Sequence, residues 1–298
     1  MAKPLTGVWT AIVTPFNEDG SIDLDSYESL VKEQEAAEVD GLVVFGTTGE
    51  SPTLTVQEKL SLLKKTKALT GNNMGIMAGS GGNNTQQTVE LSKLCVDAGA
   101  DSLLIVTPPY NKPGLNGLQA HYGAVSDAVD VPITLYHVPG RTGSFLTAAT
   151  MLEVLENPKI KAVKEASGDI GYFSKIAMNT SASLLSGDDF TYLPSLAVGG
   201  RGVVSVVTNI YPEAFVKMTK LFSEGQTSEA KIIHDALYPL TELLFHEPNP
   251  APTKAALHIK GIIKDVLRLP LTKVTVETYT RVEAALNETD AKLKQILK

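Results

Sequence analysis

Hydrophobic residues in the first two thirds of the chain form short runs, and longer amphipathic stretches separate these runs. Eight of the runs predict β-strands, at residues 9–14, 41–45, 75–79, 102–106, 132–136, 160–164, 183–186 and 202–206. Each run is almost continuously apolar, as in strands buried on both faces, and enough chain follows it for a crossover helix. The pattern therefore predicts parallel strands that alternate with helices.

Some of the intervening helices are visible in their own residues. Thr55, with Glu58 three positions later, has the spacing of a capping box and predicts a helix start just after the second strand. Apolar residues at helical spacing predict one face of another helix between the fourth and fifth strands, formed by Leu118, Tyr122, Val125 and Val129.

Eight successive strand–helix units favour a closed (β/α)8 barrel, and an open doubly wound sheet is the alternative. Beyond residue 225 the strand runs cease. Helical spacing then predicts one helix through residues 233–244 and another through 279–293, on either side of a proline-rich break at 248–252. We therefore predict an α/β protein, with a (β/α)8 TIM barrel over residues 1–224 and a C-terminal helical domain over 225–298.

Composition narrows the classes of function. The 298 residues include 26 Lys+Arg and 33 Asp+Glu, a net charge of −7 without a basic cluster, which argues against nucleic acid and anionic membrane surfaces as partners. The single cysteine, Cys95, excludes an internal disulfide, and the five histidines lack metal-ligand spacing, so no metal site is expected. No apolar run of signal-peptide or membrane-spanning length occurs. A cytoplasmic protein is expected.

The end of the sixth strand carries the first candidate for chemistry. In such a barrel, active residues lie at the carboxyl ends of strands and in the loops that follow. Two-residue alternation puts Lys164 on one face with Ile160, Ala162 and Ala166. If that face is the barrel interior, loss of hydration favours the neutral amine, which can attack a carbonyl. The alternative is a lysine at a strand end that reaches solvent.

Two further strand ends offer groups that suit a carboxylate. The turn at 46–50 has the sequence Gly-Thr-Thr-Gly-Glu, so backbone amides and the hydroxyls of Thr47 and Thr48 could bind a small anion. After the fifth strand, Tyr136 should face the interior, and Arg141 lies where a guanidinium could clamp a carboxylate. A simple tight turn, a core tyrosine and a surface arginine are the alternatives.

The loop at 108–114 is stiffened by prolines and could hold the ring of Tyr110 out from the barrel rim, unless it merely packs as an ordinary loop. Nucleotide chemistry finds no support in the sequence. No Walker phosphate loop is present, and the glycine-rich segment 79–84 lacks the third glycine of a dinucleotide-binding fingerprint.

Taken together, these motifs resemble the dihydrodipicolinate synthase and N-acetylneuraminate lyase family of pyruvate-dependent class I aldolases. The resemblance covers essentially the whole chain. Its motifs are the 46–50 turn, the Tyr110 loop, Tyr136 in Tyr-x-Val-Pro, Lys164 in Lys-Glu-Ala and the strand end at 185–188. Arg141 in Pro-Gly-Arg-Thr-Gly, with segments 247–252 and 267–270, is typical of the synthase branch, whereas the sialic-acid lyases usually lack that arginine.

The resemblance implies a lyase that needs neither metal nor cofactor. Lys164 would form a Schiff base with pyruvate, whose carboxylate would rest on Thr47 and Thr48. Loss of a methyl proton would give an enamine that attacks the aldehyde of L-aspartate 4-semialdehyde, and cyclisation would yield the heterocyclic product of lysine and diaminopimelate biosynthesis. The protonated imine serves as the electron sink for the deprotonation.

Further roles are implied in the same way. Tyr136, Thr47 and Tyr110 would form a proton relay, with Tyr110 supplied by a neighbouring subunit of a homotetramer built as a dimer of dimers. Arg141 would bind the carboxylate of the semialdehyde. The backbone at Gly187 and Val204 would line the imine pocket.

The sequence departs from the family at His137, usually Asn, which alternation turns away from Tyr136. It also departs at positions of the family's lysine-binding cleft, namely Gln87, Pro109, Val56 and Lys59. A missing carboxylate and an added cation predict weak or absent feedback by lysine. A sialic-acid lyase, a 2-keto-3-deoxy-sugar-acid aldolase and a non-catalytic barrel that serves as a binding protein are the alternative functions.

Overall fold

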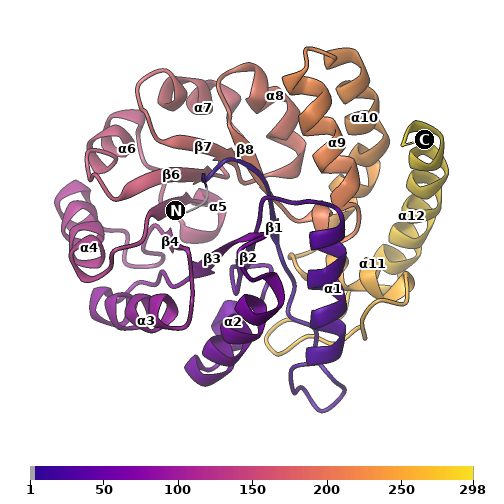
Figure 1. Cartoon of the computed structure of the whole chain (residues 1–298), viewed down its shortest axis with the longest axis horizontal. Coiled ribbons are helices and arrows are strands. Elements are labelled where there is room, and N and C mark those ends of the chain that lie inside the picture. Colours follow the sequence, from indigo (N-terminus) through magenta and orange to yellow (C-terminus); the bar gives the residue numbers. More distant parts are fainter. Residues whose placement is uncertain (1–3, 298) are drawn as a thin grey trace.

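The computed structural model describes residues 4–297, and within them eight parallel strands close into a barrel (Figure 1). Each strand pairs with the next along the chain, and the last pairs with the first. The strands are β1 (Gly7–Ala11), β2 (Gly41–Val44), β3 (Gly75–Gly79), β4 (Ser102–Val106), β5 (Ile133–His137), β6 (Ile160–Glu165), β7 (Ser183–Ser186) and β8 (Gly202–Ser205). All the predicted strands and the predicted closure are confirmed, and the open sheet is excluded. Only β1 lies two to three residues earlier than expected.

Helices surround the barrel as an outer ring (Figure 1). They are α1 (Leu24–Ala36), α2 (Val56–Thr70), α3 (Thr85–Asp97), α4 (Leu115–Ala128), α6 (Ala148–Val154), α7 (Ile170–Ala177), α8 (Tyr192–Ala197) and α9 (Pro212–Ser223), with a single turn, α5 (Pro139–Thr142), after β5. The capping box of α2 is confirmed. Thr55 Oγ1 accepts the amide of Glu58 at 3.2 Å, and the Glu58 carboxylate accepts the amide of Thr55 at 2.8 Å.

Three helices follow the barrel, as predicted for the C-terminal part of the chain. They are α10 (Thr227–Leu244), α11 (Ala251–Ile259) and α12 (Val276–Ile296), and α10 lies beside α9 (Figure 1). The predicted face of α10 is buried. Helix α11 starts inside the proline-rich break, because Pro252 falls in its first turn, where a missing N–H costs no hydrogen bond. The boundary predicted at 224/225 lies between α9 and α10 and stays a prediction. No helix in residues 4–297 is long and apolar enough to cross a membrane.

Trp9 fills the barrel interior at the amino-terminal side of the strands. Its ring leaves no room for side chains on β2 and β3: a Cβ added at Gly41 would lie 2.4 Å from Trp9 Cζ3, and one at Gly75 would lie 2.5 Å from Cη2. Val43, Met77 and other side chains of the inner cluster pack with Trp9. Side chains thus fill the amino-terminal end of the barrel, and a binding site can form only at the carboxyl ends of the strands.

The predicted alternation along β6 is wrong at its first residue. Ile160 belongs to the outer core between strands and helices, whereas Ala162 belongs to the inner cluster. The reason is a register shift: Ile133 pairs with Ile160 but Thr134 pairs with Ala162, so Lys161 is an extra residue that resets the alternation. From Ala162 onward the predicted faces hold, and Ala166 packs with the inner cluster.

Candidate active site

Lys164 and Tyr136 lie side by side inside the barrel near the carboxyl ends of β6 and β5. The sheet register pairs the two residues, and the Lys164 amine is 4.4 Å from the centroid of the Tyr136 ring. Lys164 is only 6% exposed, so its amine is not in bulk solvent. Apolar neighbours on the adjoining inner wall include Leu185 and Val204. The amine is therefore enclosed by the inner wall of the barrel, beside the phenol ring of Tyr136.

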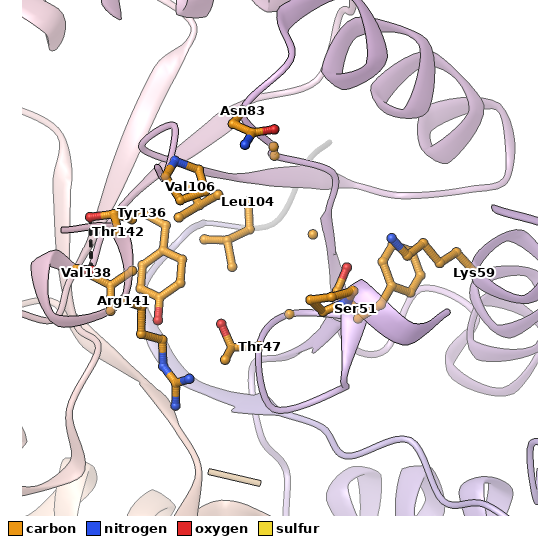
Figure 2. Close-up of a pocket in the computed structure, with 17 residues that line it drawn as sticks. Thr47, Ser51, Lys59, Asn83, Leu104, Val106, Tyr136, Val138, Arg141 and Thr142 are labelled. Atoms are coloured by element: carbon orange, nitrogen blue, oxygen red, sulfur yellow. Dashed lines mark hydrogen bonds between the residues drawn. The ribbon is translucent and has the colours of Figure 1, made fainter. Parts of the chain in front are cut away.

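A cavity of about 500 Å³ opens beside Tyr136, and Thr47, Tyr136, Val138 and Arg141 contribute to its wall, whereas Lys164 lies behind Tyr136 and is not one of the residues that line it. Figure 2 shows the hydroxyl groups of Thr47 and Tyr136 facing each other across the cavity, with the guanidinium of Arg141 just beyond them. Two hydroxyls and a cation thus converge on one space, which suits a small keto acid and a second carboxylate.

The turn after β2 and the turn α5 carry the groups predicted to bind carboxylates, of which Thr47 and Arg141 line the cavity and Thr48 does not. Thr48 is buried, and its hydroxyl oxygen accepts a hydrogen bond from Asn249 Nδ2 at 2.8 Å. Arg141 Nη2 donates to the main-chain oxygen of Asn249 at 3.3 Å. Asn249 belongs to the loop between α10 and α11, so the C-terminal part of the chain supports both groups. Sequence reasoning cited this loop only as a family motif and missed the contact.

The ends of β7 and β8 form the wall beside the Lys164 side chain. The Gly187 amide donates to the Glu165 oxygen at 2.6 Å, and a Cβ added at Gly187 would lie 3.1 Å from Lys164 Cε. Only glycine therefore fits there without moving the lysine. Val204 faces the interior from β8, and Asp189 fixes the end of that strand by accepting the amide of Val206 at 3.0 Å.

Sequence reasoning cited Asp188 only as part of the family motif at 185–188 and gave its carboxyl group no role. Burial raises the pKa of the Asp188 carboxyl to about 6, while the nearby Lys164 and Arg141 cations act in the opposite direction. A carboxyl group that titrates near neutrality beside two cations of the cavity is a feature typical of active sites.

A buried ion pair anchors the turn that carries Thr47 and Thr48. Glu50, the last residue of the 46–50 motif, pairs with Lys254 of α11, and both side chains are fully buried. The other Glu50 oxygen accepts the amide of Arg268 at 3.1 Å, and the Lys254 amine donates to the Val266 oxygen at 2.9 Å. Burial lowers the pKa of Lys254 to about 8, against the opposing effect of the Glu50 carboxylate.

Comparison with known proteins bears directly on this site. The model of the dihydrodipicolinate synthetase family matches residues 4–289. The chain belongs to the dihydrodipicolinate synthetase family. It is 44% identical over 280 residues to 4-hydroxy-tetrahydrodipicolinate synthase 1 of Halalkalibacterium halodurans, which covers 93% of this chain and 95% of that protein. The family resemblance of the motifs is thereby confirmed.

Solved structures agree with this assignment over nearly the whole length. The 4-hydroxy-tetrahydrodipicolinate synthase of Methylacidiphilum fumariolicum has a TM-score of 0.95 and 37% identity, covering 98% of each chain. The chloride-inhibited dihydrodipicolinate synthase of Acinetobacter baumannii, solved with pyruvate, has a TM-score of 0.93 and 37% identity, covering 96% of this chain and 99% of that one.

His137 lies on the outer side of the strands β5 and β6 that carry Tyr136 and Lys164, and its side chain is turned away from Tyr136. The Leu146 amide donates to its Nε2 at 3.1 Å, so the ring proton is on Nδ1, which contacts Glu165 Oε1 at 3.2 Å. His137 and Glu165 are paired in the sheet directly after Tyr136 and Lys164. The side-chain contact therefore ties β5 to β6 on the outer face at the level of the site.

Tyr110 is the one predicted relay residue that the structure does not bring to the cavity. Its side chain is 89% exposed, and its backbone has a φ of 71°, a left-handed conformation uncommon for a non-glycine residue. Its amide donates to the Thr142 oxygen at 3.4 Å. The loop is therefore attached to the rim of the cavity while the ring points away from its own chain.

Two of the four residues compared with the family's lysine-binding cleft line the same cavity. Lys59, Pro109 and Asn83 line it, and Figure 2 shows Lys59 on the side of the cavity opposite Tyr136 and Arg141. Val56 and Gln87 are exposed and do not line it. Burial lowers the pKa of Lys59 from its usual value. Within residues 4–297, no group of three or more His, Cys, Asp or Glu side chains could hold a metal ion.

Proposed function

We propose a route, through Lys164, for the reaction that this lyase of lysine biosynthesis catalyses. The reaction is the condensation of pyruvate with L-aspartate 4-semialdehyde. The observation that carries the route is the burial of the Lys164 amine inside the barrel, 4.4 Å from the Tyr136 ring. A lysine amine held inside the barrel can act as the nucleophile that attacks a keto carbon.

The proposed chemistry starts with attack of the Lys164 nitrogen on C2 of pyruvate. The carbonyl oxygen leaves as water, and a protonated imine forms. Its positive nitrogen accepts electrons when the methyl group loses a proton, which gives an enamine. The enamine carbon then bonds to the aldehyde carbon of the semialdehyde, whose oxygen takes up a proton. Attack by the substrate amine on C2 closes the ring and frees Lys164, so no further cofactor enters the balance.

The groups on the cavity wall take the remaining roles in this proposal. Thr47 and Thr48 bind the pyruvate carboxylate, as supported by the hydroxyls and buried turn described above; the Acinetobacter relative was solved with pyruvate. Arg141 binds the carboxylate of the semialdehyde, since a guanidinium can hold a carboxylate bidentately. Main-chain groups at Gly187 and Val204 line the imine.

Protons move through Tyr136 and Thr47, whose hydroxyls face each other, and then through Tyr110 of a second copy of the chain. The exposure and left-handed backbone of Tyr110 support this role, because such a ring can enter a neighbour's cavity. The proposal thus includes self-association, as a homotetramer built from two dimers. A cytoplasmic location also belongs to it, and the buried free thiol of Cys95 suits a reducing compartment.

Borohydride reduction in the presence of pyruvate tests the route. Intact-mass measurement and peptide mapping should find a reduced pyruvate adduct on Lys164, and Lys164→Ala should give none. Lys161→Ala is the matched control, because Lys161 lies on the same strand but is exposed. An adduct on another lysine, or no adduct on the parent chain, would refute the proposal.

A further inference from the structure

Asn249 lies beneath two of the proposed substrate-binding side chains. Its Nδ2 donates to Thr48 Oγ1 at 2.8 Å, and its main-chain oxygen accepts from Arg141 Nη2 at 3.3 Å. Thr253 Oγ1, one helical turn further on, donates to Asn249 Oδ1 at 3.1 Å. Asn249, Thr48 and Thr253 are all buried, so bulk water does not replace these partners. The mechanism above gives Asn249 no role.

The direction of the bond to Thr48 decides what the Thr48 hydroxyl can do. A threonine hydroxyl carries one proton and two acceptor positions. Because Thr48 Oγ1 accepts from Asn249, it keeps its own proton for another partner. A carboxylate has only acceptor oxygens, so a hydroxyl binds it only by donating. Thr253 occupies Asn249 Oδ1 and thereby turns Nδ2 towards Thr48.

We propose that Asn249 is a positioning residue that keeps the Thr48 hydroxyl a donor to the carboxylate of the keto-acid substrate. This inference rests on the proposed function, which places that carboxylate on Thr48. The two contacts of Asn249 separate cleanly. Its side chain acts on Thr48, whereas its main-chain oxygen acts on Arg141 and survives any substitution. Loss of the side chain should therefore weaken pyruvate binding and leave semialdehyde binding nearly unchanged.

The test is Asn249→Ala, assayed by borohydride trapping of the Lys164 adduct against pyruvate concentration and by steady-state kinetics. The pyruvate concentration for half-maximal trapping, and the KM for pyruvate, should rise about 3–10-fold, as for the loss of one hydrogen bond. The trapping plateau should match that of the parent chain, and the KM for the semialdehyde should change less than about twofold. Asn179→Ala is the matched control, since that exposed amide only donates to the Lys175 oxygen, at 2.8 Å.

A second set of variants separates positioning from a merely structural effect. Adding Asn249→Ala to Thr48→Val should cost less than about a further twofold, because Asn249 acts through the hydroxyl that valine lacks. Asn249→Asp should weaken pyruvate binding more than Asn249→Ala, because the new carboxylate would accept the hydrogen bond that Thr48 otherwise donates to the substrate. Thr253→Val keeps Asn249 but removes its orienting donor, and it should shift pyruvate binding in the same direction even if Asn249→Ala fails to fold.

Two results would overturn the inference: trapping in Asn249→Ala with the parent's concentration dependence, or an equal loss in the Thr48→Val background. The inference is also overturned if Asn249→Ala does not fold and Thr253→Val leaves pyruvate binding unchanged. Absence of any Lys164 adduct in the parent chain is a different failure. It would refute the proposed function, and so the two failures can be told apart.

Discussion

Replacing Lys254 by methionine should destabilise the protein by about 3–5 kcal/mol, because it leaves the Glu50 carboxylate buried and uncompensated. Both side chains are fully buried, and after the change the Glu50 side chain keeps the Arg268 amide, at 3.1 Å, as a hydrogen-bond donor but has no ion-pair partner within residues 4–297. Methionine is of similar length and can still pack on the Phe16 ring, although the cation–π contact of the Lys254 amine, 4.1 Å from the ring centroid, is lost together with the charge. The loss therefore reports the charge and not the volume.

The assay is urea unfolding followed by circular dichroism, with the melting temperature as a second measure, expected to fall by roughly 5–15 °C. The double variant Glu50→Gln and Lys254→Met should recover most of the loss, since it removes the orphaned charge. Lys231→Met is the control, because Lys231 pairs with Asp235 on the exposed face of α10 and should cost less than about 0.5 kcal/mol. A loss below about 1 kcal/mol for Lys254→Met, or no recovery in the double variant, would refute the reasoning.

Four further changes have defined outcomes. Tyr136→Phe should lower kcat by about 10²–10⁴-fold with unchanged circular dichroism, as expected for loss of an acid–base group, and near-parental turnover would remove Tyr136 from the relay. Gly187→Ala should cost about 1–3 kcal/mol and reduce adduct formation on Lys164, because its Cβ would lie 2.7 Å from Ala166 Cβ and 3.1 Å from Lys164 Cε; unchanged stability and full trapping would contradict this. Because the pKa of Asp188 is raised to about 6, its ionisation destabilises the folded chain as the pH rises from about 4 to 7. The stability of Asp188→Asn relative to the parent chain should therefore increase by up to about 3 kcal/mol over that range. Urea unfolding at both ends of the range measures this difference, and a constant difference would contradict the prediction. Initial rates should be nearly unchanged by millimolar lysine, because the Lys59 cation lies in the cavity that a cationic effector would enter, and strong inhibition would reject this prediction.

The barrel strands were predictable because their signal is local. Strands buried on both faces are continuously apolar, and parallel pairing requires a long connection after each, so both features stand in the sequence itself. The same holds for the start of α2, where Thr55 and Glu58 are three residues apart. The inward direction of Tyr136 also followed from the alternation of a single strand.

Features that depend on distant contacts left no such signal. The extra residue Lys161 in β6 depends on how two strands pair, so alternation alone placed Ile160 on the wrong face. Asn249 meets Thr48 across 201 residues of chain, and the motif at 247–252, although typical of the family, does not indicate this contact. The raised pKa of Asp188 likewise arises from burial, which only the folded chain creates.

The contacts of the C-terminal helices change how the predicted boundary at 224/225 should be understood. Asn249 holds Thr48 and Arg141, and Lys254 neutralises Glu50. A barrel without these helices would keep Lys164 and Tyr136, but its turn after β2 would carry a buried carboxylate without a counter-ion. A buried charge without a partner destabilises a folded protein strongly, because the carboxylate loses its hydration and gains no ion pair. We therefore expect the helices to be part of the catalytic unit, since they supply the charge and the hydrogen bonds that hold the turn proposed to bind the pyruvate carboxylate.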